Sequence, residues 1–167
     1  RRYQGTYKHW DMICMGYKAN MFDIQAALLL PQIPRLHQNH RKREAVFSRY
    51  QEGLQASKGI RFPKILPGTR HALHLFTIWV QPDIRDVFLS GLQSRGIGVA
   101  VNYRAVHLLT YCRETFGFQV GAFPEAERIG SRTLSLPFYP GLRDPEIEAV
   151  IHAVKAVLDS ASPSCSP

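Results

Sequence analysis

The first regular pattern of hydrophobic and polar positions predicts a long helical segment that begins at Asp23. Asp23 is a good helix-capping residue, and apolar side chains recur between residues 24 and 36 at spacings that place them on one face. Pro31 and Pro34 each remove a backbone donor, so we expect the helix to kink or restart there. A second helical stretch with the same apolar spacing then runs to about Gln55.

Three later segments have the β-branched and aromatic composition of strands. They are residues 74–80, 97–103 and 133–136. Between them, the pattern predicts a helix around residues 87–92 that stops at Gly96, because glycine readily adopts the left-handed conformation that ends a helix. A further helix is predicted over residues 123–132.

The last helix is predicted over residues 144–158. Asp144 can cap it, Pro145 suits its first position, and Glu146 adds an acidic side chain to its first turn. One face carries the apolar stripe Ile147, Val150, Ile151, Val154 and Leu158. The order helix, strand, helix, strand, helix, strand, helix predicts an α/β or α+β fold. We expect residues 160–167 to be a disordered tail.

Composition narrows the possible partners of the chain. Its 167 residues with 45% hydrophobic content suit one compact unit, and its net charge of +8 favours anionic partners such as nucleotides or phosphates. The basic cluster at residues 40–43 is typical of a solvated helix face, so nucleic acid is the least favoured of the possible partners.

The sequence also bears on where the protein is found. No apolar run is long enough to span a bilayer, so we expect no association with a membrane. Three widely separated cysteines favour a cytoplasmic protein.

Five segments carry motifs that follow one another in a set order. Residues 16–27 read GYKANMFDIQAA, 71–76 read HALHLF, 96–107 run from GIG to NYRAVH, 123–127 read FPEAE, and 134–142 read LSLPFYPGL. Together they resemble the DegT/DnrJ/StrS family of nucleotide-sugar aminotransferases, whose members fold as type I pyridoxal 5'-phosphate (PLP) enzymes and work as dimers. The resemblance is nearest to the branch of the 4-amino-4-deoxy-arabinose type, which aminates 4-keto sugars on nucleotide carriers.

The resemblance also implies a division of the chain. Residues 1–22 would be a loop that enters from a large domain outside this chain, and residues 23–159 would be the C-terminal small domain, including a long interdomain helix. Transamination needs a lysine that holds PLP as a Schiff base. In the family, that lysine lies upstream of the glycine-tyrosine segment, so we expect no catalytic residue here and an inactive isolated chain. Lys8 lacks the family's serine-rich context and is expected to be an ordinary surface lysine.

Two residues of the first motif are candidates for the cofactor site. By resemblance, Lys18 and Asn20 would reach the cofactor phosphate, or substrate phosphates, across the interface of a homodimer. An ammonium and an amide can both donate hydrogen bonds to anionic oxygens.

Four residues of the third motif are candidates for binding the nucleotide-linked keto sugar. By resemblance, Asn102 and Tyr103 would face the sugar, His107 would form a wall of the site, and Arg104 would pair with a substrate phosphate. A packed aromatic ring is the alternative for Tyr103, and a surface role is the alternative for Arg104. Asn102 departs from the family, in which a histidine is usual, and Ala105 stands where a proline is common.

The resemblance implies an aminotransferase with glutamate as amino donor, in cell-surface polysaccharide, lipid A or antibiotic sugar biosynthesis. Two alternatives stay open: a non-catalytic module that dimerises or binds a nucleotide sugar, and a sugar dehydratase of the same family. A metal site is not expected, because His71 and His74 would lie on opposite sides of any strand they shared.

Overall fold

A short antiparallel sheet forms the centre of the fold. Strand β1 (Phe76–Trp79) pairs with strand β2 (Thr133–Leu136), and Phe76 lies opposite Leu136. Every residue of β2 is buried, whereas β1 alternates between buried and half-buried positions, so β2 is the more interior strand. The structure is a computed structural model that describes residues 7 and 9–161.

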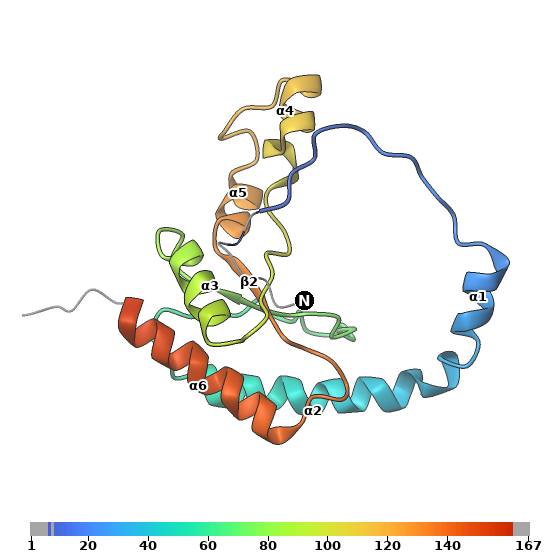
Figure 1. Cartoon of the computed structure of the whole chain (residues 1–167), viewed down its shortest axis with the longest axis vertical. Helices are drawn as coiled ribbons and strands as arrows, with labels where there is room; N and C mark the ends of the chain where they lie inside the picture. Colours follow the sequence, from blue (N-terminus) through green and yellow to red (C-terminus); the bar gives the residue numbers. More distant parts are fainter. Residues whose placement is uncertain (1–6, 8, 162–167) are drawn as a thin grey trace, which may run out of the picture.

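Three helices pack with the sheet around one hydrophobic core. They are α2 (Leu36–Leu54), α3 (Arg85–Ser94) and α6 (Asp144–Ala161). Helix α6 packs against both α2 and α3 (Figure 1). The apolar stripes of these helices supply most of the core around the two strands, because burying them removes their side chains from water.

Two mid-helix glycines allow α6 to approach its neighbours closely. A Cβ atom on Gly53 of α2 would lie 2.6 Å from Cδ1 of Ile151, and one on Gly91 of α3 would lie 2.9 Å from Cγ1 of Val157. Both distances are shorter than ordinary Cβ contacts, so a side chain at either glycine would force Ile151 or Val157 to move.

The prolines divide the first helical segment as predicted. Helix α1 (Asp23–Leu29) ends before Pro31, and a short 3-10 helix, η1 (Ile33–Arg35), contains Pro34 and leads directly into α2. Helix α2 ends at Leu54, one residue before the predicted end.

A second group of short helices lies at one end of the molecule (Figure 1). It comprises η2 (Val106–Leu108), α4 (Thr110–Phe116) and α5 (Pro124–Gly130). Helix α5 confirms the helix predicted over residues 123–132. The sequence pattern predicted neither η2 nor α4.

The prediction of a strand over residues 97–103 was wrong. This segment meets β2 at a single bridge, where Ala100 and Ser135 exchange two backbone hydrogen bonds of 3.2 and 2.8 Å. Val99 and Val101 are buried in the core, so their strand-like composition reflects packing rather than a continuous ladder.

The remaining predicted boundaries are close to those observed. Strand β2 has the predicted bounds, β1 is shorter than the predicted 74–80, and Gly96 follows α3 with a φ of +78°. Helix α6 reaches Ala161, so the predicted tail does not begin at residue 160; residues 162–167 lie outside the described residues.

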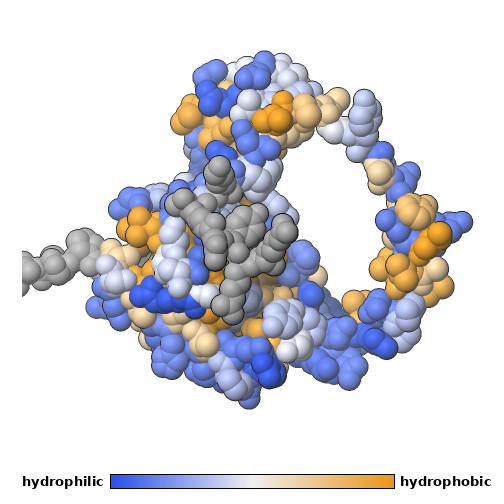
Figure 2. Space-filling model, viewed as in Figure 1, coloured by the Kyte–Doolittle hydropathy of each residue, from blue (hydrophilic) through white to orange (hydrophobic). Residues whose placement is uncertain are grey.

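Residues 9–22, called the arm below, contain no helix or strand and arch away from the core to α1 (Figure 1). No residue of α1 is buried. The apolar face predicted for residues 24–36 therefore has no partner among the described residues, and hydrophobic side chains gather on α1 in Figure 2. None of the described helices is both long and apolar enough to cross a membrane.

Candidate functional site

Three of the candidate sugar-binding residues lie together in an open groove. The groove has a volume of about 510 Å³ and lies between the segment that begins at Tyr103 and helix α5. Tyr103, Arg104 and His107 all line it. Asn102 is not among the lining residues; it is half-buried, and its backbone carbonyl accepts a hydrogen bond from Thr133 Oγ1 at 3.5 Å.

A close backbone contact forms one side of this groove. A Cβ atom on Gly130, the last residue of α5, would lie 2.6 Å from the backbone nitrogen of Ala105 and 3.3 Å from the carbonyl oxygen of Tyr103. Only glycine fits there without displacing the backbone. The end of α5 is thereby held directly against the segment that carries Tyr103 and Arg104.

His107 is buried and forms a charge-assisted hydrogen bond beneath the groove. Its Nε2 donates to Oε1 of Glu127 at 2.9 Å. The same carboxylate accepts the backbone N–H groups of Gly121, at 2.8 and 3.0 Å, and of Phe123, at 3.3 Å. These hydrogen bonds, with that from His107 the largest cause, hold the pKa of Glu127 below its usual range.

This arrangement places His107 in a wall of the groove, and its role in binding a substrate stays a prediction. The imidazole is fixed in orientation by Glu127, and its ring meets Phe123 edge-on with the centroids 4.9 Å apart. The pair joins the segment around His107 to the loop that precedes α5. Sequence reasoning missed Glu127 as a site residue, although it is the last residue of the FPEAE motif.

Tyr103 and Arg104 lie at the rim of the groove and contact the arm. Tyr103 has 59% of its surface exposed, and its ring meets Trp10 edge-on with the centroids 6.2 Å apart. Arg104 is half-buried, and its Nη1 donates to the backbone carbonyl of Trp10 at 3.3 Å. The other guanidinium N–H donors allow Arg104 to bind an anion as well.

The first part of the arm is fixed beside the groove by a long-range helix cap. Asp11 accepts hydrogen bonds from the backbone nitrogen of Thr110, at 3.0 Å, and from its hydroxyl, at 2.5 Å, at the first residue of α4. The hydroxyl bond is the main reason that the pKa of Asp11 is lowered. His9 also contacts Asp86 of α3 at 3.1 Å. Nothing in the local sequence signals these contacts, because their partners lie more than 70 positions away.

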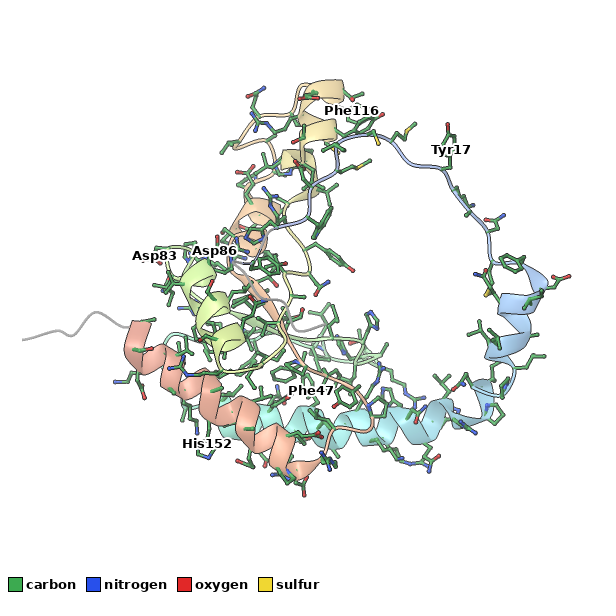
Figure 3. All side chains as sticks on the ribbon, in the orientation of Figure 1. Tyr17, Phe47, Asp83, Asp86, Phe116 and His152 are labelled. Carbon is green, nitrogen blue, oxygen red and sulfur yellow. The ribbon has the colours of Figure 1, made fainter. Side chains whose placement is uncertain are left out.

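Lys18 and Asn20 do not join the groove. Both are exposed on the part of the arm beyond its anchor, and neither lines the groove. Figure 3 shows the neighbouring Tyr17 out on the arm, apart from Phe116 at the groove. Their ammonium and amide donors fit the phosphate of a PLP cofactor, but the site would need walls from outside the described residues.

The histidines do not assemble a metal centre. His71 and His74 precede β1 rather than lying within it, and Nδ1 of His71 accepts the backbone N–H of Leu73 at 3.0 Å. In the part of the chain that the structure describes, no three His, Cys, Asp or Glu side chains are placed to hold a metal ion.

The amino-acid sequence of this chain matches one family of aminotransferases over most of its length. The family model described as the DegT/DnrJ/EryC1/StrS aminotransferase family matches residues 1–155. The spore coat polysaccharide biosynthesis protein SpsC of Bacillus subtilis (strain 168) is 35% identical over 158 residues, which cover 92% of this chain and 41% of SpsC.

Solved structures agree with the sequence match. The aminotransferase TlmJ from Streptoalloteichus hindustanus matches with a TM-score of 0.74 and 29% identity, over 84% of this chain and 37% of TlmJ. The PLP-form of Spr1654 from Streptococcus pneumoniae matches with a TM-score of 0.79 and 27% identity, over 92% of this chain and 40% of that protein. The chain thus spans about 40% of the length of the relatives that it matches.

Proposed function

The chain belongs to the DegT/DnrJ/EryC1/StrS aminotransferase family, and we propose that it is the C-terminal portion of a PLP-dependent aminotransferase that converts a nucleotide-linked keto sugar to an amino sugar. Its fold is part of the type I fold of PLP-dependent aminotransferases. The observation that carries the proposal is the meeting of Tyr103, Arg104 and His107 in one groove within a fold that matches sugar aminotransferases.

The groove supports a nucleotide-linked sugar as the substrate. Arg104 offers guanidinium donors at the rim, where a diphosphate can bind through charge-assisted hydrogen bonds. Tyr103, the neighbouring residue, offers an exposed ring and its hydroxyl. A phenol hydroxyl can donate a hydrogen bond to a sugar hydroxyl or accept one from it. Glutamate, the amino donor in this proposal, and the sugar diphosphate are both anionic. The net charge of +8 on this chain favours the binding of such ligands.

Lys18 and Asn20 are the residues of this chain that we assign to the cofactor phosphate. Their role in the proposed enzyme is to donate hydrogen bonds to anionic oxygens from the exposed part of the arm. When bound, PLP supplies the electron sink that stabilises the carbanion left when the amino donor loses its α-proton.

The Schiff-base lysine would come from outside this chain. Every lysine of the described residues is exposed rather than enclosed in a site: Lys18, Lys42, Lys58, Lys64 and Lys155. Lys8 lies outside the described residues.

A homodimer in the cytoplasm completes the proposal. The exposed apolar side chains of α1 and η1 form a hydrophobic surface, and contact with a second subunit would bury this surface away from solvent. The same contact would bring the arm of one subunit to the cofactor site of the other.

The test uses the polypeptide encoded by the complete reading frame that contains this chain. Purified with PLP, it should form more than one equivalent of 2-oxoglutarate per subunit from glutamate only when a nucleotide-linked 4-keto sugar is present to take up the amino group. The isolated 167-residue chain should form none. A sugar product that has lost a hydroxyl and carries no amino group would indicate the dehydratase alternative and overturn the proposal.

A further inference from the structure

One wall of the groove is aromatic, and the proposed function so far gives it no role. Phe116, Phe118 and Phe123 line the groove in succession, with ring centroids 5.9 Å apart between the first two and 5.5 Å between the last two. Phe116 is 60% exposed and Phe123 is 48% exposed. Large aromatic rings left in contact with water at the wall of a concave surface are typical of a binding site for an apolar or planar group.

The aromatic wall is held in place before any ligand binds. The backbone N–H of Phe123 donates to Glu127, and the rings of Phe118 and Phe123 both meet His107 edge-on, at 6.3 and 4.9 Å between centroids. Gly121, with a φ of +91°, makes the turn between the two phenylalanines and also donates to Glu127. A wall fixed in this way loses little conformational freedom when a ligand binds.

We propose that this groove binds the nucleobase of the nucleotide-linked sugar, with Phe116 and Phe123 as its stacking surfaces and Arg104 as the donor to the diphosphate. The inference rests on the proposed function and names the part of the substrate that the groove holds. Nucleobases stack on aromatic side chains without needing specific hydrogen bonds, which suits a wall that is almost wholly apolar.

The shape and charge of the groove favour this ligand over a purely apolar one. Its volume of about 510 Å³ lies in the range of small-molecule pockets, roughly 300–1,000 Å³. An aliphatic side chain of another protein would use the aromatic wall but would not use the guanidinium donors of Arg104 at the rim. A nucleoside diphosphate has both a flat apolar face and a charged group, so it satisfies the wall and the rim together.

The test measures binding of UDP, dTDP and GDP to the protein of the complete reading frame, by isothermal titration calorimetry and by saturation-transfer NMR. We expect at least one of these ligands to bind with its base protons receiving more saturation than its ribose protons. Phe116→Ala and Phe123→Ala should each raise its Kd by about tenfold. Phe116 is the more exposed of the two, so Phe116→Ala should keep the thermal midpoint of the parent protein, whereas Phe123→Ala also loses ring contacts with His107 and Phe118.

Two controls separate the base from the phosphates. Val87→Ala removes an equally exposed apolar side chain on α3, outside the groove, and should leave Kd unchanged. Ribose 5-phosphate has no base, and its binding should not respond to either phenylalanine variant.

The inference is overturned if none of the three nucleotides binds, or if both phenylalanine variants bind the nucleotide as tightly as Val87→Ala does. Formation of 2-oxoglutarate by the same protein is measured separately. An active enzyme with unaltered nucleotide affinity in both variants would retain the proposed function and place the base elsewhere.

Discussion

His107 and Glu127 lie 20 positions apart in the sequence, and their side chains meet at 2.9 Å beneath the groove. The pair connects two motifs, NYRAVH and FPEAE, that the sequence shows only as separate segments. Because Glu127 also accepts the N–H groups of Gly121 and Phe123, one carboxylate positions both the imidazole and the aromatic loop.

Replacing this carboxylate should loosen the loop. In Glu127→Gln, an NH₂ group that cannot accept hydrogen bonds replaces one of the two oxygens, and the negative charge facing His107 is lost. We expect faster amide hydrogen exchange at Gly121 and Phe123. Glu125→Gln is the matched control, because Glu125 is exposed and, among the described residues, its side chain hydrogen-bonds with Arg128 of its own helix. Equal exchange rates in the two variants would contradict the role of Glu127.

The groove also depends on Gly130. A methyl group at this position would meet the backbone of Ala105 rather than a movable side chain, so Gly130→Ala should destabilise the protein by about 1–3 kcal/mol. Gly98→Ala is the control, since its added methyl group would have no atom of the described residues within 4 Å apart from its own chain neighbours. Urea denaturation gives both values, and a Gly130→Ala variant as stable as Gly98→Ala would show that the contact is not tight.

Acid should remove the stabilisation that comes from the start of α6. The side chain of Arg143, and then its backbone N–H, bonds to Glu146 and lowers the pKa of this carboxyl to about 2. A pKa lower in the folded state stabilises the fold at pH values above the unfolded pKa, about 4.3. That stabilisation is lost as the pH falls through the folded value.

This expectation is measured as the difference in unfolding free energy between the parent protein and Glu146→Gln. The difference should be constant near neutral pH and shrink between about pH 4 and pH 2. Glu52→Gln, which changes an exposed carboxyl on α2, serves as the control. A difference for Glu146→Gln that does not change with pH would rule out the linkage.

The proposed homodimer predicts an effect of charge on α1. Ile24 is 72% exposed here, and Ile24→Glu would place a carboxylate in the apolar face that we expect a second subunit to cover. In the protein of the complete reading frame, this variant should sediment as a monomer at concentrations where the parent is dimeric. Val87→Glu on α3 should remain dimeric; if Ile24→Glu does too, α1 is not at the interface.

The elements that the sequence predicted well are those with local signals. Strand β2 and helix α6 carry their own composition, cap and turn residues, and the prolines mark the division of α1 from α2. Helix α4 was missed because its cap, Asp11, comes from the arm rather than from the neighbouring sequence. A long-range partner of this kind leaves no periodicity to read.

The candidate site was predicted in part. Tyr103, Arg104 and His107 were identified through one short motif, and they meet in the groove. The phenylalanines of the aromatic wall and Glu127 were not identified, because their roles depend on how a loop folds back onto His107. Whether Lys18 and Asn20 reach a cofactor depends on contacts outside the described residues, so their roles remain proposals.

The most direct test of the central claim is to follow nitrogen from glutamate to the sugar. The protein of the complete reading frame is incubated with PLP, ¹⁵N-labelled glutamate and a nucleotide-linked 4-keto sugar, and the sugar product is analysed by mass spectrometry. We predict that the product carries one ¹⁵N atom in place of its keto oxygen. A sugar that contains no ¹⁵N after this incubation would contradict the assignment of this chain to a sugar aminotransferase.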